Sequence, residues 1–166
     1  NLLPPNILPP EIDTDHAGRT RGLFVDSANP IITAADTHAY RKAFDKLELL
    51  VVIDVAMTGT ASLAHYVLPA SSQYEKWEAT FFTLEFPKNA FHLRKPLFEP
   101  LPGTLAEAEI YTRLIRAMGE LPDDFAELRA AAGQGRMAYA MAFRQRLKQQ
   151  PELADYGPIM LYETLG

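Results

Sequence analysis

The sequence has 166 residues, of which 48% are hydrophobic and 22% charged, as is typical of a globular protein with a sizeable core. The net charge is −5 without a block of like charge, which argues against binding to nucleic acid, and no apolar run approaches the roughly 20 residues that span a bilayer. Cysteine is absent, so thiolate metal sites, iron–sulfur ligation and disulfides are excluded within these residues.

The first 20 residues contain two Pro-Pro pairs, at positions 4–5 and 9–10. Proline lacks the backbone N–H and has a fixed φ. We therefore predict an extended lead-in over residues 1–20, neither helical nor part of a sheet. The sequence starts with Asn1 in place of Met and stops at Gly166 without an obvious tail, so we expect it to be an excerpt of a longer polypeptide.

A strand is predicted over 22–27, and Asn29-Pro30 ends it. The segment from Asp36 to Leu47 has apolar residues at helical spacing, with Thr33 or Asp36 as its N-cap. Together these features predict a strand followed by an amphipathic helix.

The segment from Leu49 to Val55 is almost continuously apolar, which indicates a parallel strand covered on both faces. A short helix over 60–64 and a third strand over 66–68 are predicted next. The resulting order, βαβαβ, predicts an open parallel α/β sheet with flanking helices over residues 21–119.

The sequence after the third predicted strand is less regular, up to a strong helix signal that begins at Thr104. Residues 79–86 favour a strand and residues 90–95 an extended return. Thr104 and Glu107 have the spacing of a capping box, which predicts a helix that ends at Gly119. Its expected buried stripe consists of Ile110, Tyr111, Leu114, Ile115 and Met118.

Residues 120–166 are predicted to form a helical C-terminal extension. Asp123 is the expected cap of a helix over 125–132, which Gly133 and Gly135 interrupt. A further helix is predicted over 136–150, where Pro151 stops it.

Asp54 is the sharpest candidate for ligand contact, because ligands of open α/β sheets bind just beyond the carboxyl ends of the strands. A carboxylate there can accept paired hydrogen bonds from N1–H and the exocyclic amine of guanine. The alternative is local, since aspartate often caps the turn that follows it.

Other polar residues near this edge have similar pairs of interpretations. Asn29 is either a ligand contact or a simple turn residue before proline. Thr58 and Thr60 can donate to phosphate or ribose, or Thr60 is only an N-cap. Lys76 can pair with a phosphate or remain a solvated charge. The four histidines show no metal-ligand spacing.

These residues resemble a part of the molybdopterin oxidoreductases, the family of dimethyl-sulfoxide reductase and formate dehydrogenase. The resemblance rests on LFVDSANPI at 23–31, on the stretch 40–70 with Tyr74-Glu75-Lys76 behind it, and on RKPLFEP at 94–100 leading to 108–119. The family often has glycine at the position of Ser27 and aspartate at that of His65. The stretch after Lys76 differs from the nitrate-reductase-like branch, which argues against nitrate reduction.

The resemblance implies a Rossmann-like domain that holds part of a pyranopterin guanine dinucleotide, two of which bind one molybdenum or tungsten in the family. Asn29, Asp54, Thr58 and Lys76 match family positions near this cofactor, and Ser27 is a further candidate.

The resemblance also implies partners and further groups. The other domains of a parent chain and a small-molecule substrate would be the partners, and an iron–sulfur cluster would belong to the N-terminal part of that chain. We expect the 166-residue segment to be inactive alone. The competing hypothesis is a stand-alone nucleotide-binding or scaffolding α/β module without redox chemistry.

Overall fold

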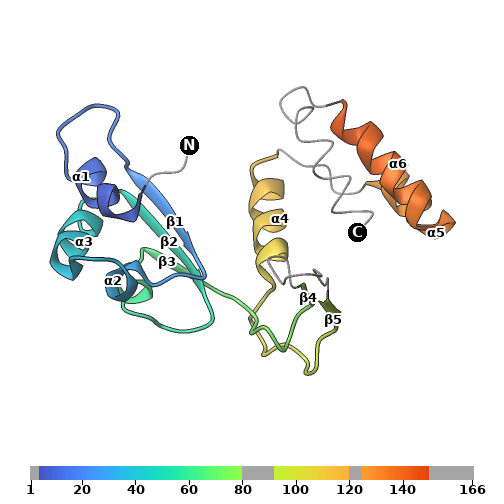
Figure 1. Cartoon of the computed structure of the whole chain (residues 1–166), viewed down its shortest axis with the longest axis horizontal. Helices are drawn as coiled ribbons and strands as arrows, with labels where there is room; N and C mark the ends of the chain where they lie inside the picture. Colours follow the sequence, from blue (N-terminus) through green and yellow to red (C-terminus); the bar gives the residue numbers. More distant parts are fainter. Residues whose placement is uncertain (1–3, 80–91, 120–124, 150–166) are drawn as a thin grey trace, which may run out of the picture. The chain divides into compact units, whose positions relative to one another are not determined.

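The computed structural model describes residues 4–79, 92–119 and 125–149 (Figure 1). By its internal contacts the chain divides into two compact units. The first unit consists of Asn1–Ala79 and His92–Thr112, and the second of Thr80–Phe91 and Arg113–Gly166. Each is described by itself below.

The first unit is built on a parallel sheet. Within the described residues this sheet has three strands, β1 (Gly22–Asp26), β2 (Leu49–Asp54) and β3 (Tyr66–Pro69), in the order β1-β2-β3. Val52 of β2 lies between Val25 of β1 and Val67 of β3. The predicted parallel α/β sheet is confirmed. Its most apolar strand, β2, is the central one and is paired with a strand on each side.

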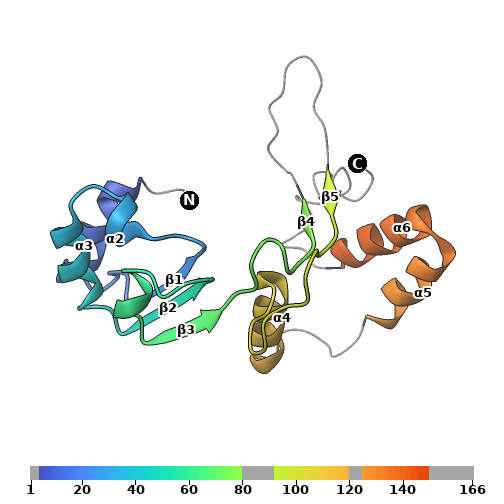
Figure 2. The ribbon, with the colours of Figure 1, turned by 90° about the horizontal axis from the view of Figure 1, so that it is seen from below.

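The helices α1 (Leu8–Ile12), α2 (Pro30–Thr33) and α3 (Thr37–Phe44) lie on the same side of this sheet (Figure 2). Asp36 caps α3 in a left-handed conformation (φ 62°) and accepts a hydrogen bond from the Ala39 N–H, as predicted. The core between helices and sheet comprises Ile12, Val25, Ile31, Tyr40, Ala43, Phe44, Leu47, Leu50, Val52 and Ala61.

The prediction of an extended N-terminal segment is wrong. Residues Pro5–Ile7 form a 3₁₀ turn, and α1 follows it directly. In both elements the prolines occupy the first helical positions, where no N–H is needed and the fixed φ suits a helix. Ile12 is fully buried in the core, and the Tyr40 hydroxyl donates to the Pro5 carbonyl.

The first unit continues with an antiparallel pair, β4 (Glu78–Ala79) and β5 (Leu93–Arg94). Most of the strand predicted over 79–86 lies outside the described residues. The helix α4 (Glu107–Ala117) then begins in the first unit and ends in the second. Gly119 follows it with a φ of +79°, which agrees with the predicted stop.

The predicted capping box is wrong. The helix α4 begins at Glu107 itself, and the Thr104 hydroxyl donates to the Leu101 carbonyl. The Glu107 carboxylate is instead bound to Lys76. The expected buried stripe is also wrong in part, because of its members only Ile110 is buried, whereas Met118 is 72% exposed.

In the second unit α5 (Ala126–Gln134) packs against α6 (Arg136–Leu147). The helix α5 runs through Gly133, contrary to the prediction, and Gly135 alone separates the helices with a φ of +113°. The predicted cap at Asp123 lies outside the described residues. In the part of the chain that the structure describes, no helix is long and apolar enough to cross a membrane.

Candidate functional site at the carboxyl edge of the sheet

Asp54 ends β2, and its carboxylate first of all caps the turn that follows. Oδ1 accepts hydrogen bonds from the Val55 N–H at 2.7 Å and the Ala56 N–H at 3.3 Å. Oδ2 accepts one hydrogen bond, from the Thr58 hydroxyl at 3.3 Å. A carboxylate has about four acceptor positions, so Oδ2 retains capacity for a further donor.

Thr58 connects this carboxylate to the next element. Its Oγ1 donates to Asp54 and accepts from the Ala61 N–H at 3.2 Å, at the start of the 3₁₀ turn Ala61–Leu63. Thr60 occupies the N-cap position of this turn, as one of its two interpretations had it, but its side chain makes no capping bond there, and the Thr58 side chain accepts from the Ala61 N–H instead. One threonine thus couples the end of β2 to the following turn.

Asn29 and Thr60 join the two loops that leave β1 and β2. The Asn29 Oδ1 accepts hydrogen bonds from the Thr60 N–H at 3.2 Å and from the Thr60 hydroxyl at 2.8 Å. Thr60 is fully buried, so it is a structural link and not a group that touches phosphate or ribose.

Ser27 lies directly after β1 in the left-handed region, with a φ of 53°. Its backbone N–H continues the ladder to the Ile53 carbonyl at 3.0 Å, and its hydroxyl donates to Asp26 at 2.8 Å. A left-handed φ favours glycine, so Ser27 holds a backbone conformation that side chains disfavour.

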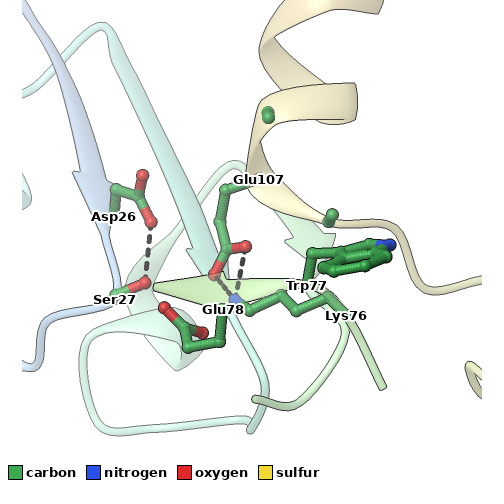
Figure 3. Close-up of a pocket in the computed structure, with 8 residues that line it drawn as sticks. Asp26, Ser27, Lys76, Trp77, Glu78 and Glu107 are labelled. Carbon is green, nitrogen blue, oxygen red and sulfur yellow. Dashed lines mark hydrogen bonds and ion pairs between the residues drawn. The ribbon is translucent and has the colours of Figure 1, made fainter. Parts of the chain in front are cut away.

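Lys76 and Ser27 line one pocket of about 440 Å³ in the first unit (Figure 3). Figure 3 shows that the Lys76 ammonium is directed to the Glu107 carboxylate, to which it is bound through both oxygens. The pocket lining consists of Asp26, Ser27, Lys76, Trp77, Glu78, Ala106, Glu107 and Ala108.

Asp26, which lines the pocket, makes a second polar link to α4. The Tyr111 hydroxyl of α4 donates to Asp26 Oδ2 at 3.0 Å. Burial, then this hydrogen bond and the charges of Asp26 and Glu107, raise the pKa of Tyr111. Two links therefore attach the first turns of α4 to the end of β1 and the segment before β4.

The charge of this pocket suits hydrogen-bond donors better than anions. Three carboxylates, of Asp26, Glu78 and Glu107, face one lysine that is already paired. The loops at the edge add exposed apolar side chains, with Val55 63% and Met57 70% exposed. Carboxylates accept hydrogen bonds, so this pocket suits a ligand group that donates them.

The structure thus joins Asp54 to Thr58 and, separately, Asn29 to Thr60 through hydrogen bonds, and it places Ser27 and Lys76 in the neighbouring pocket. Sequence reasoning missed Glu107 and Tyr111 as partners in this region. Their contacts join residues 31 and 85 positions apart, so no local spacing signals them. Among the described residues, no group of three histidines or carboxylates is arranged to hold a metal ion.

Comparison with known proteins identifies the class. The model of the molybdopterin oxidoreductase family matches residues 2–102. The chain is 44% identical over 55 residues to formate dehydrogenase H of Escherichia coli, a match that covers 33% of this chain and 8% of the relative. It is 30% identical over 142 residues to the assimilatory nitrate reductase catalytic subunit of Bacillus subtilis, covering 80% of this chain and 19% of the relative.

The chain belongs to the molybdopterin oxidoreductase family. A solved structure, acetylene hydratase from Pelobacter acetylenicus, shares the fold with a TM-score of 0.62 at 24% identity over 70% of this chain and 16% of that one. The chain spans less than a fifth of the length of the curated relatives that it matches.

Proposed function

We propose that this chain is part of a molybdenum- or tungsten-dependent oxidoreductase and supplies part of the site for a pyranopterin guanine dinucleotide. Membership of the family supports the general class. The observation that carries the finer proposal is Asp54, a carboxylate with remaining acceptor capacity at the carboxyl edge of a parallel sheet. In Rossmann-like folds nucleotides bind at this edge.

Asp54 is proposed to hold the guanine. Guanine offers two donors, N1–H and the exocyclic amine, and a carboxylate is the side chain that accepts both. Oδ2 has a free acceptor position, and Oδ1 accepts from the Ala56 N–H at 3.3 Å, a long hydrogen bond that a ligand donor can replace. The same residue then caps the turn and selects guanine over adenine.

The remaining residues are proposed to act around this contact. Thr58 orients Asp54 through its hydroxyl, and Asn29 offers an amide donor from the neighbouring loop. Ser27 and Lys76 line the adjacent pocket. Because Lys76 is paired with Glu107, we assign it to shaping this pocket and not to neutralising a free phosphate.

The residues of this chain fit the guanine end of the cofactor better than its phosphate end. Carboxylates outnumber cations in the pocket, so the pyrophosphate would depend on backbone N–H groups or on other parts of the enzyme. When bound, the cofactor supplies a metal centre that exchanges electrons with the substrate. The electron acceptor, a small-molecule substrate and the other domains of the parent chain would be the partners.

The test uses the protein expressed from its full reading frame. Bound metal is measured by mass spectrometry, and guanine nucleotide is measured after acid release. The proposal expects molybdenum or tungsten together with guanine in excess of metal. A folded protein with neither would leave only a nucleotide-binding or scaffolding module, and turnover by the 166-residue segment alone would contradict the assignment of catalysis to the whole enzyme.

Asp54→Asn tests the residue itself. Asparagine can still cap the turn through its oxygen, but its amide nitrogen would face the guanine donors. We expect guanine retention to fall at least about tenfold, the loss of one charged hydrogen bond. Asp45→Asn, which removes the same charge at the exposed end of α3, is the control. Equal retention in both variants would remove Asp54 from the site.

A further inference from the structure

The link between Asn29 and Thr60 fixes which group Asn29 can offer to a ligand. Backbone N–H groups only donate, and the Thr60 N–H points at the Asn29 side chain at 3.2 Å. The Asn29 atom at this place must therefore be the oxygen, Oδ1. The orientation of the amide follows from the chain itself.

The same reasoning determines the acceptor to which the Thr60 hydroxyl donates its proton. Thr60 Oγ1 accepts from the Ile31 N–H at 3.3 Å, so its own proton is free to donate to Asn29 Oδ1 at 2.8 Å. Thr60 is fully buried, and all its polar groups in this network have partners. A buried network that is fully satisfied holds one arrangement, because every alternative leaves a buried polar group unpaired.

The Asn29 amide nitrogen, Nδ2, takes no part in this network. Among the described residues, Nδ2 of Asn29 has no hydrogen-bond partner, and no buried side-chain nitrogen or oxygen there lacks one. Nδ2 is therefore accessible to solvent at the carboxyl edge, one loop away from Asp54.

We propose that Thr60 is a positioning residue that holds the Asn29 amide with its NH₂ group toward the ligand, so that the ligand atom at this place is a hydrogen-bond acceptor. This inference rests on the proposed function. Asp54 and Asn29 then form a complementary pair, in which the carboxylate accepts and the amide donates. The acceptor is either a carbonyl oxygen of the base or a phosphate oxygen.

Asn29→Asp is the decisive substitution. Aspartate retains the oxygen that accepts from Thr60 but replaces the donor with a second, charged oxygen. We expect guanine retention by the full-length protein to fall on the order of 10- to 100-fold. Asn6→Asp, which introduces the same charge at an exposed position of the N-terminal 3₁₀ turn, should retain guanine as the unmodified protein does. Undiminished retention in Asn29→Asp would overturn the inference.

A double-mutant cycle separates positioning from a purely structural role of Thr60. Thr60→Val should lower guanine retention when Asn29 is present but add no further loss in an Asn29→Ala background, and Thr60→Ser should restore retention. If Thr60→Val causes the same loss in both backgrounds, Thr60 does not act through Asn29 and the inference fails.

Two probes identify the acceptor. The affinities of guanosine and of GDP for the cofactor-free protein are compared for the unmodified chain and for Asn29→Asp. A loss confined to GDP identifies a phosphate oxygen, an equal loss for both identifies the base, and no loss for either contradicts the inference. Asp54→Asn separates the two levels of the argument, because loss of guanine there with none in Asn29→Asp refutes only the role of Asn29. Absence of guanine from the unmodified protein refutes the proposed function itself.

Discussion

The two groups of candidate residues in the first unit are held in different ways. At the edge of β1 and β2, uncharged hydrogen bonds join the loops around a fully buried threonine: Thr60 donates to Asn29, and the Ala61 N–H donates to Thr58. At the pocket, an ion pair between Lys76 and Glu107 joins segments far apart in sequence, with side chains 15% and 22% exposed. At the edge, geometry is thus fixed by buried uncharged donors and acceptors, whereas at the pocket a largely buried ion pair holds the start of α4.

The largest effect on folding stability should come from Thr60→Val. Valine has nearly the same shape but leaves the Ile31 N–H without its acceptor in a buried place. We expect a loss of about 1–3 kcal/mol in the free energy of unfolding, measured by urea denaturation. Thr33→Val removes an exposed hydroxyl of the same neighbourhood and should change stability by less than about 0.5 kcal/mol. Equal losses in the two variants would mean that the buried hydrogen bonds of Thr60 stabilise the fold no more than an exposed one.

The ion pair between Lys76 and Glu107 should contribute less to folding stability than the buried hydrogen bonds of Thr60. A double-mutant cycle with Lys76→Gln and Glu107→Gln is expected to give a coupling energy of about 1 kcal/mol, between that of surface and buried pairs. The coupling should shrink in 1 M salt on the scale of charge screening. The more exposed pair of Arg146 and Glu127, with side chains 33% and 50% exposed, serves as the control and should give less. A coupling energy larger than the stability loss in Thr60→Val would reverse the comparison.

The smallest effect should appear only at alkaline pH. Burial and the contact with Asp26 raise the pKa of Tyr111 in the folded chain. The native state therefore holds this proton more tightly, so the contribution is complete below the ordinary tyrosine pKa of about 10 and is lost as the pH rises through the folded value. Tyr111→Phe should flatten this part of the stability curve. Thr60→Val removes no titrating group, so its curve should stay parallel to that of the unmodified chain, and a slope unchanged in Tyr111→Phe would contradict the assignment.

The sequence by itself determined the sheet and part of the edge. The apolar run of β2 and the spacing of α3 with its cap at Asp36 are local patterns, and the structure confirms them. Asp54 at a strand end was identifiable for the same reason, as was the alternative that it caps a turn, which the structure shows as well. Such features depend on a few neighbouring residues, whose preferences are intrinsic.

Only the tertiary structure decided the contacts between distant segments. The N-terminal prolines begin a helix because Ile12 has a core to pack into, which no local signal reveals. Glu107 binds Lys76 and does not close a capping box, because an ammonium group lies within reach only after folding. That the Thr60 side chain forms a buried link is also a matter of tertiary structure. Its partner Asn29 is 31 residues away, and burial then makes each hydrogen bond of the link costly to lose.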